Sequence, residues 1–290
     1  MEWKVSVIIP VFNSAQFLKM AVDSCALLDE VGEVLLIDDG STDNSFFTCL
    51  DLQKKYEKLE VLKHIDGKNH GVSATRNLGI KNSRFDFVAF LDSDDYYLPT
   101  RFRKAKQLCM LDHTVDGVYD AAQYDDDYAV GNKKLYSITE PIKPSDLFYF
   151  LLTGQKGFFC TNTITIKKSL FERAGMFLES TRMHEDTELW LRLAFYGRLV
   201  AGELNKPVAV INRHATNAIY GRNQQTLEKL GGTLIGYYSD KDLSHLQRRA
   251  LLESYWRSRS LRFKNNLLRR MFYYLNFTTD FFKLVLKIKK

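Results

Sequence analysis

The first third of the chain alternates short apolar runs with longer amphipathic stretches, and this rhythm constrains the fold more than any other feature. The apolar runs predict buried strands at Val5–Val11, Glu33–Ile37, Val61–His64 and Phe85–Leu91. Helical spacing predicts helices at Ser14–Leu28, Asn44–Tyr56, Val72–Asn82 and Pro99–Leu111. Strands that alternate with helices form crossover units, so we expect an α/β fold with a mostly parallel central sheet and helices on both faces.

The remainder of the sequence suggests a division near residue 220. Residues 115–166 form an irregular segment with short apolar stretches, Glu185–Tyr196 has helical spacing, and Val200–Asn212 indicates one or two strands. From about Gln224 onward the sequence is helical, with basic and aromatic residues interleaved. We therefore expect a body over residues 1–220 and a basic, amphipathic helical extension over residues 221–290.

Composition excludes several classes of protein. The chain is 45% hydrophobic and 26% charged, values of ordinary globular proteins and not of disordered ones. The N-terminal segment lacks a basic leader and a cleavage site, and no apolar run reaches about 18 residues, so we expect no signal peptide, no membrane-spanning helix and a cytoplasmic location. The four cysteines form no CxxC pair and are expected to be thiols.

Acidic residues follow two of the predicted strands. Ligands bind beyond the carboxyl ends of parallel strands, and those ends carry Asp39 and the cluster Asp92–Asp95. Carboxylate oxygens suit Mg²⁺ or Mn²⁺, whose shell is usually completed by phosphate and water; the alternative is a solvated turn that caps the next helix. We expect Asp39 to accept hydrogen bonds from a nucleobase or ribose. The acidic run Asp125–Asp127 follows no strong strand and indicates a solvated loop.

Two further features suit an anionic ligand. Gly71 precedes a predicted helix, whose free N–H groups and dipole favour phosphate, and Arg76 adds a bidentate anion donor. The alternative for Arg76 is an ordinary surface position. His214 follows a predicted strand, where an imidazole would complete a metal shell or contact phosphate, although most single histidines are structural.

The helix Glu185–Tyr196 begins with a pair of acids. Asp186 shares the inward stripe with Leu189, so its carboxylate would line a cleft with a raised pKa and suit a general base. The alternative for both Glu185 and Asp186 is capping of the helix dipole, which suits Glu185 well. Glu188 and Arg192 are four residues apart and are expected to form a solvated ion pair on the outer face.

Taken in order, five blocks resemble family 2 glycosyltransferases of the GT-A fold. The blocks are Val5-Ser-Val-Ile-Ile-Pro-Val-Phe-Asn13, Leu36-Ile-Asp-Asp-Gly-Ser-Thr-Asp43, Gly71-Val-Ser-Ala-Thr-Arg-Asn77, Phe90-Leu-Asp-Ser-Asp-Asp95 and Glu185-Asp186. The resemblance covers roughly the first 215 residues and leaves the tail outside it. It implies a GT-A-like catalytic domain and an inverting, divalent-metal-dependent transfer from a nucleotide diphosphate sugar, expected to be a UDP-sugar. The acceptor would be a hydroxyl of a glycan or a lipid-linked glycan, in cell-surface polysaccharide synthesis.

The resemblance also implies a role for each matched residue. Pro10 and Asp39 would line the nucleoside pocket, Arg76 would lie beside the donor, Asp92 would face the ribose, Asp94 would bind Mn²⁺ or Mg²⁺, Asp186 would deprotonate the acceptor, and His214 would lie near the diphosphate and the metal. A dinucleotide oxidoreductase is disfavoured, because the residues after the first strand lack GxGxxG. A non-catalytic sugar-nucleotide-binding or scaffolding protein remains the alternative.

The charge of the chain is concentrated at its C-terminal end. Residues 246–290 carry twelve Lys and Arg residues against two acids, a net charge of +10, whereas the whole chain has +6. Basic amphipathic helices of this kind bind anionic membranes, so we expect peripheral contact with the cytoplasmic face of a membrane. The alternative is a helical subdomain that packs its aromatic residues on the body. No nucleic-acid motif accompanies the charge, and no nucleic-acid partner is expected.

Overall fold

The computed structural model describes residues 2–126, 131, 134–181, 183–213, 224–261, 263 and 265–287, the last seven by their backbone alone. The chain forms two compact units. The first unit contains Met1–Leu147 and Lys156–Ala215, and the second contains Phe148–Gln155 and Thr216–Lys290.

Within the described residues, the first unit is built on a seven-stranded sheet with the order β3-β2-β1-β4-β8-β6-β9. These strands are β1 (Val5–Val11), β2 (Val31–Asp38), β3 (Leu59–Lys63), β4 (Phe87–Phe90), β6 (Gly117–Tyr119), β8 (Ile164–Lys167) and β9 (Leu199–Ala201). Strand β8 runs antiparallel to both of its neighbours, and the other pairs are parallel. The predicted α/β fold with a mostly parallel sheet is confirmed. A smaller sheet has the order β5 (Tyr96–Tyr97), β10 (Pro207–Ile211) and β7 (Ala121–Tyr124).

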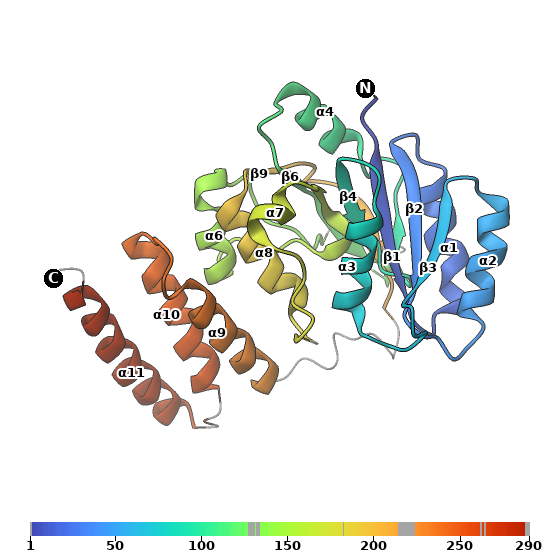
Figure 1. The fold of residues 1–290 in the computed structure, drawn as a ribbon. Coiled ribbons are helices and arrows are strands. Elements are labelled where there is room, and N and C mark those ends of the chain that lie inside the picture. Colours follow the sequence, from blue (N-terminus) through green and yellow to red (C-terminus); the bar gives the residue numbers. More distant parts are fainter. Residues whose placement is uncertain are drawn as a thin grey trace. The chain divides into compact units, whose positions relative to one another are not determined.

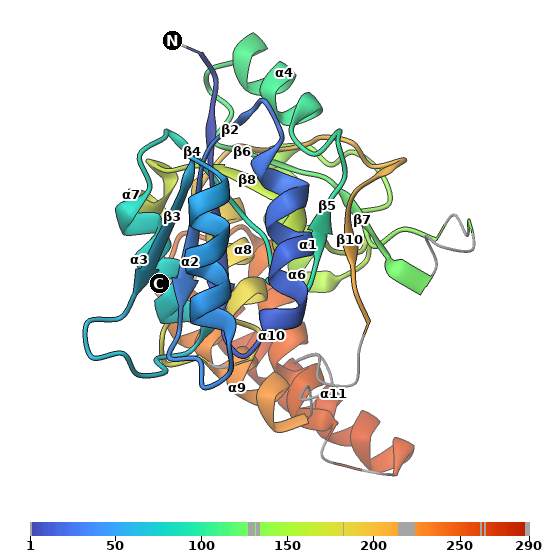
Figure 2. The same cartoon turned by 90° about the vertical axis from the view of Figure 1, so that its right-hand side faces the viewer.

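Helices cover both faces of the large sheet, as Figures 1 and 2 show. Helices α1 (Ala15–Ala26) and α2 (Ser45–Lys55) lie on one face, and α3 (Val72–Asn82) lies on the other. Helix α3 approaches the sheet closely because Gly79 has no side chain: a Cβ there would lie 2.5 Å from Cγ2 of Ile8. Helix α8 (Glu185–Tyr196) lies on the same face as α3, and its Trp190 contacts Phe90 of β4.

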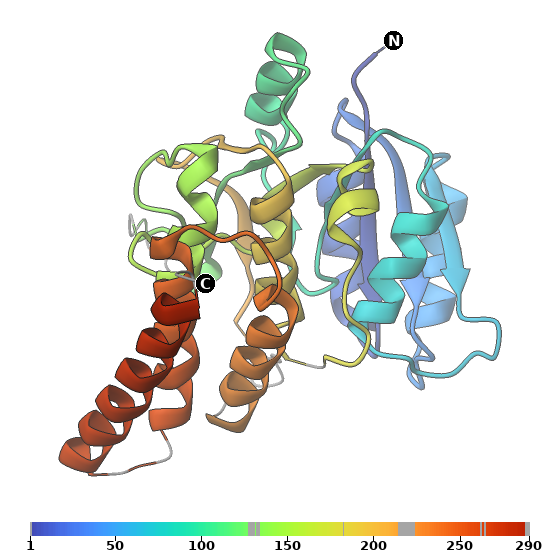
Figure 3. The ribbon, with the colours of Figure 1, turned by 60° about the vertical axis from the view of Figure 1, so that its left-hand side comes forward.

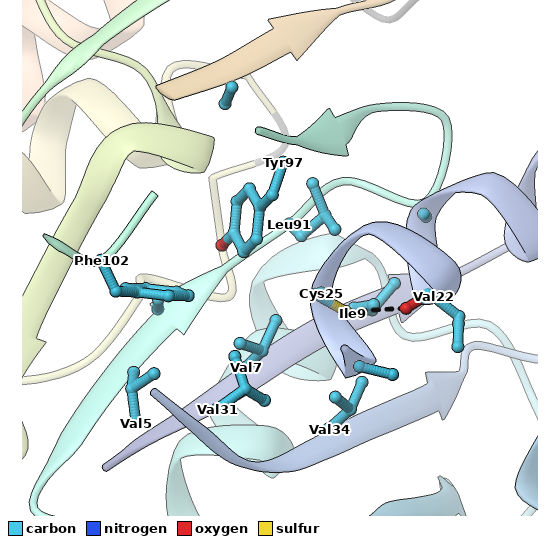
Figure 4. Packing of buried hydrophobic residues seen from close by; sticks show 14 of the residues in the cluster. Val5, Val7, Ile9, Val22, Cys25, Val31, Val34, Leu91, Tyr97 and Phe102 are labelled. Carbon is cyan, nitrogen blue, oxygen red and sulfur yellow. Dashed lines mark hydrogen bonds between the residues drawn. The ribbon is translucent and has the colours of Figure 1, made fainter. Parts of the chain in front are cut away.

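The main core lies between the large sheet and α1 (Figure 4). Alternate residues of β1, such as Val7 and Ile9, meet Val22 and Cys25 of α1, and all four are inaccessible to solvent. Burial of each such side chain stabilises the fold by about 1.5–3 kcal/mol. Both faces of β1 are covered, which explains why its sequence is apolar on both faces apart from the buried Ser6. Burial also raises the pKa of the Cys25 thiol to about 12.

The segment expected to be irregular contains more regular structure than its sequence indicated. Besides β6, β7 and β8 it holds α6 (Pro144–Thr153) and the 3₁₀ turn Thr161–Thr163. Pro144 occupies the first position of α6, where its missing N–H costs nothing. Two other helices also differ from expectation. Helix α4 (Arg103–Leu111) begins four residues later than expected, and α7 (Leu170–Ala174) was not expected.

The second unit consists largely of the helices α9 (Gln224–Tyr238), α10 (His245–Ser260) and α11 (Asn266–Lys287), seen in Figure 3. Helix α10 begins with a capping box, in which the Ser244 N–H donates to Gln247 and the Gln247 N–H donates to the Ser244 hydroxyl. Phe148 of α6 packs against Tyr238 of α9, with ring centroids 5.0 Å apart. Every helix in the described part of the chain is too short or too polar to cross a bilayer.

Candidate active site

The acids predicted to bind the donor follow strands that end at the same edge of the large sheet. Strands β2 and β4 are parallel to β1 and lie on either side of it. Pro10 lies near the end of β1 and Asp39 directly follows β2. Asp92 comes two residues after β4, and its N–H donates to Oδ1 of Asn162 at 2.9 Å. The carboxyl ends of three strands thus bring these side chains to one rim.

Asp39 fixes the start of α3. Its carboxylate is 3% exposed and accepts hydrogen bonds from the N–H groups of His70 and Gly71, at 2.7 and 2.9 Å. The His64 Nε2 atom lies 3.4 Å from the same carboxylate. Gly71 has a φ of 89°, a left-handed conformation that favours glycine. Because a carboxylate has about four acceptor sites, these two bonds leave Asp39 capacity for a ligand.

Arg76 connects the strand-end loop after β4 with helix α8. The side chain lies on α3 and is 4% exposed; Nη2 donates to Oδ1 of Asp92 at 2.7 Å and Nη1 donates to Oε1 of Glu185 at 3.0 Å. Burial lowers the pKa of Arg76, but the charges of Asp92, Glu185 and Asp186 outweigh it and raise that pKa. Arg76 is therefore a fixed positive charge at the rim, not the ordinary surface residue that was the alternative.

Glu185 has a different role from the one expected, because its carboxylate is the second partner of Arg76. Burial raises the pKa of Glu185, the Asp186 charge adds to the rise, and Arg76 opposes it. Two consecutive acids in a first helical turn look alike in sequence. No local signal shows that one of them reaches an arginine 109 residues away along the chain.

Asp186 lies in the same first turn of α8 and is half-buried. Its Oδ1 atom accepts hydrogen bonds from the Thr187 N–H at 2.6 Å and the Thr187 hydroxyl at 3.2 Å. Since Glu185 is bound to Arg76 and Arg76 to Asp92, the Asp186 turn is tied to the strand-end loop after β4. The structure thus brings the predicted base and the predicted donor-binding acids to one region of the first unit.

The expectation that Glu188 and Arg192 form a solvated pair is wrong. The pair exists, with Nε of Arg192 2.7 Å from Glu188, but Glu188 is fully buried and Arg192 is 2% exposed. The guanidinium also donates to the carbonyl oxygens of Ala174 and Met176, at 2.6 and 2.8 Å. The end of α7 and the residues after it therefore cover the face of α8 that helical spacing indicated as outer.

Asp95 is a structural member of the acidic cluster that the sequence did not distinguish. It is buried and accepts hydrogen bonds from the side-chain amide of Asn162 and, at 2.8 Å, from the Asn212 N–H. Burial, together with the charges of Asp92 and Asp94, raises the pKa of Asp95 well above its usual range. Asp95 thereby joins the acidic loop to the chain that follows β10.

The predicted metal site can be compared with the side chains that could bind a metal ion at this edge of the sheet. The described residues contain no group of three or more His, Cys, Asp and Glu side chains placed to hold a metal ion. A Mg²⁺ or Mn²⁺ site completed by diphosphate and water needs only one or two carboxylates. The half-buried Asp92 and Asp94 supply oxygen ligands of that kind, so the residues fit such an ion.

Two other predictions concern the chain around β10. His214 lies outside the described residues. Its neighbour Arg213 pairs with Asp126 at 2.8 Å, and the Arg213 N–H donates to Asp125 at 3.1 Å. In the acidic run that was expected to be a solvated loop, Asp125 is half-buried and Asp126 is exposed. Asp127 is not among the described residues.

Comparison with known structures shows the same fold in two proteins whose structures contain nucleotide sugars. The structure of S. aureus TarS in complex with UDP-GlcNAc superposes with a TM-score of 0.66 at 20% identity, over 96% of this chain and 80% of that one. The mannosyltransferase PcManGT from Pyrobaculum calidifontis, in complex with GDP-Man and Mn²⁺, gives a TM-score of 0.60 at 16% identity, over 87% and 69%. At these identities the likeness shows the fold, which is GT-A-like.

Sequence comparison gives the family. An uncharacterized glycosyltransferase of Rickettsia felis is 29% identical over 67% of this chain and 30% of its own length. Glycosyltransferase GlyA of Streptococcus pneumoniae is 29% identical over 60% and 22%. The chain thus spans less than a third of the length of these two relatives. The pattern of glycosyl transferase family 2 matches residues 6–175, more than half of the chain. With this match and the GT-A-like fold, the chain belongs to glycosyl transferase family 2.

Proposed function

We propose that this chain transfers a sugar from a nucleotide diphosphate sugar to a hydroxyl group, with inversion at the anomeric carbon. The observation that carries the proposal is the pair of ionic bonds from Arg76 to Asp92 and Glu185. These bonds support the proposal because they tie the first turn of α8, which contains Asp186, to the loop after β4, and ligands of parallel sheets bind beyond such strand ends. A binding protein would need the donor-side acids but no additional acid in a turn tied to them.

The donor would bind along the rim from β1 to β4. Pro10 and Asp39 would line the nucleoside pocket, Asp92 would accept a hydrogen bond from the ribose, and Arg76 would hold positive charge beside the donor. A UDP-sugar is the proposed donor, supported by TarS, whose structure contains UDP-GlcNAc. PcManGT, whose structure contains GDP-Man, supports the wider class of nucleotide sugars.

A divalent cation would be held by Asp94, with His214 as a further ligand. When bound, Mn²⁺ or Mg²⁺ neutralises negative charge on the departing nucleoside diphosphate. PcManGT, whose structure contains Mn²⁺, supports this assignment. The carboxylate of Asp94 supports it independently, because hard divalent ions favour oxygen ligands.

Asp186 would act as the general base. A single in-line displacement inverts the anomeric centre, and it requires one base on the acceptor side of the sugar and no covalent nucleophile. The Asp186 carboxylate would take the proton of the acceptor hydroxyl as that oxygen attacks the anomeric carbon. The hydrogen bonds from Thr187 hold Oδ1 of Asp186 in one orientation.

The proposed acceptor is a glycan or a lipid-linked glycan, and the proposed role is in cell-surface polysaccharide synthesis. Such acceptors are presented at a membrane, and the C-terminal region has a net charge of +10. We therefore propose a cytoplasmic protein in peripheral contact with an anionic membrane. Residues 1–220 would form the catalytic domain and residues 221–290 the extension.

Donor hydrolysis tests the transferase against a non-catalytic sugar-nucleotide-binding protein. Release of UDP from UDP-sugars with Mn²⁺ is measured for the wild type, Asp94→Asn and Asp186→Asn, with Asp51→Asn as the control. Asp51 is exposed on α2, so that variant should match the wild type. We expect Asp186→Asn to lose at least 100-fold in rate, since general base catalysis contributes about 10²–10⁴-fold. We expect Asp94→Asn to lose the part of the rate that the divalent cation supplies. Binding of UDP without turnover in any version would favour the non-catalytic protein.

A further inference from the structure

Helix α11 has one face that packs within the second unit. Residues 269, 272, 273, 276, 277 and 280 are half-buried and recur at helical spacing. Phe272 contacts Trp256 of α10 and Phe263, with ring centroids 5.7 and 5.0 Å apart. The Trp256 Nε1–H donates to Asp280 at 3.1 Å. These contacts fix which side of α11 faces α10.

The opposite face of α11 is apolar and exposed. Five large side chains, here called the outer stripe, are between 51% and 66% exposed: Leu267, Leu268, Met271, Tyr274 and Leu275. Their spacing of i, i+1, i+4, i+7 and i+8 places them on one side of the helix. A contiguous apolar surface of this kind is typical of an interaction site, whereas scattered exposed apolar residues are not.

The charge around the outer stripe indicates what covers it. Exposed Arg270 lies beside the stripe, and residues 246–290 carry a net charge of +10. Pairing two copies of the chain through α11 would bring two such positive regions together. An anionic lipid surface offers apolar chains for the stripe and negative head groups for the basic residues. A helix with one apolar face and basic flanks is of the type that lies in the plane of a bilayer.

We propose that α11 lies in the interface of an anionic bilayer, with the outer stripe inserted among the acyl chains and its other face packed on α10. The inference rests on the peripheral location proposed above and names the surface responsible for it. It does not depend on the donor, the metal or Asp186.

Vesicle flotation tests the assignment. The full chain is mixed with vesicles of phosphatidylcholine alone or with phosphatidylglycerol added. We expect the wild type to float with the anionic vesicles, and M271S/L275S to bind them at least tenfold more weakly. The matched control is M110S/L111S, which changes the same two residue types at exposed positions of α4 and should bind as the wild type does. A second variant, L267S/L268S, and circular dichroism of all variants separate loss of the surface from loss of the fold.

Three results would overturn the inference. The first is equal binding of anionic vesicles by the wild type and both folded stripe variants. The second is equal binding of neutral and anionic vesicles by the wild type. The third is a wild-type dimer in solution that the stripe variants convert to a monomer, which would identify a self-association surface. Donor hydrolysis is measured on the same samples: normal flotation without hydrolysis contradicts the proposed transferase alone, and normal hydrolysis without flotation contradicts this inference alone.

Discussion

One of the buried ion pairs of the first unit is connected to the acidic loop through Asn162. Arg101 and Asp120 approach to 3.2 Å, and both side chains are inaccessible or nearly so. Arg101 also donates to the carbonyl oxygens of Asn162 and Ile164, at 2.8 and 2.9 Å. The Asn162 side chain in turn binds Asp92 and Asp95. The pair therefore supports the turn that positions the acids of the candidate active site.

Asp120 gives the protein a pH-dependent stability. Burial, only partly offset by Arg101, raises the pKa of Asp120 to about 6, against about 3.9 in the unfolded chain. At pH values between these two pKa values, the folded state binds more protons than the unfolded state. The contribution of Asp120 to the free energy of unfolding therefore increases as the pH falls from about 6 to 4. The same contribution is lost as the pH rises through about 6. The change is on the order of 2–3 kcal/mol.

Urea unfolding of the wild type and Asp120→Asn at pH 4, 5, 6 and 7 measures this contribution. At pH 7 the neutral amide of Asp120→Asn avoids the cost of burying a carboxylate, so the variant should be at least as stable as the wild type. The difference between the two free energies of unfolding should change toward pH 4, because the wild type gains from protonation of Asp120 and the variant cannot. A gap that is constant from pH 4 to pH 7 would contradict the assignment. Other carboxylates titrate in both proteins and cancel in the difference.

Chain topology explains why the sequence could bring two of the candidate residues together. Asp39 and Asp92 each follow a parallel strand, and this rule predicts that they share an edge. Glu185, Asn162 and Asp95 were not recognised, because each acts through a partner distant in sequence. Tertiary contacts of this kind leave no periodic signal in the chain.

Among the elements, α3 is connected to several parts of the candidate active site. Asp39 binds the two residues before the helix, His70 and Gly71, and Arg76 in the second turn of the helix binds both Asp92 and Glu185. The helix thus joins the loops after β2 and β4 to the start of α8.

Replacing Arg76 tests this connection. Arg76→Met leaves Glu185 and Asp92 without their cation and should cost about 3 kcal/mol in the free energy of unfolding. Arg76→Lys should lower the free energy of unfolding by less, because one ammonium group can still pair with a carboxylate. It should nevertheless slow turnover, because one ammonium group cannot bridge both carboxylates. Urea unfolding and donor hydrolysis measure the two effects. Lys54→Met is the control, since its pair with Asp51 is exposed and worth about 1 kcal/mol or less. Equal stability of all three variants would refute the role of Arg76.

The bounds of a helix or strand were predicted best where its pattern of apolar residues is clear. The bounds of β1, α3 and α8 match the expected ranges. Strand β1 is mostly apolar, and α8 has a stripe of apolar residues at helical spacing. Helix α6 was missed although its buried residues, Leu147, Phe148, Leu151 and Leu152, have helical spacing. The apolar run Leu147–Leu152 is six residues long and also fits a buried strand, and only the tertiary fold decides between the two.

The whole molecule differs from two consecutive domains, because residues 148–155 group with the C-terminal unit. Phe148 is 1% exposed and contacts Tyr238 within that unit. A chain truncated after residue 220 therefore loses the partners of Phe148. We expect its thermal midpoint to fall by several degrees relative to the full chain.

Tyr238→Ala in the full chain should lower the free energy of unfolding by about 3–5 kcal/mol.

The control for the truncation is Asp51→Asn in the full chain, an exposed change on α2 that should leave the midpoint unchanged. Differential scanning fluorimetry of the three proteins at one protein concentration makes the comparison. A truncated chain as stable as the full chain would show that residues 148–155 need no support from the C-terminal helices.

The path of the chain between the two units bears on how the protein is synthesised. Phe148 leaves the ribosome about 90 residues before Tyr238, a delay of roughly 5–20 s at translation rates of about 5–20 residues per second. During that interval the nascent polypeptide exposes an aromatic side chain that the finished protein covers. Chaperones that bind apolar segments would meet this protein at the second half of α6, before its last helices are made.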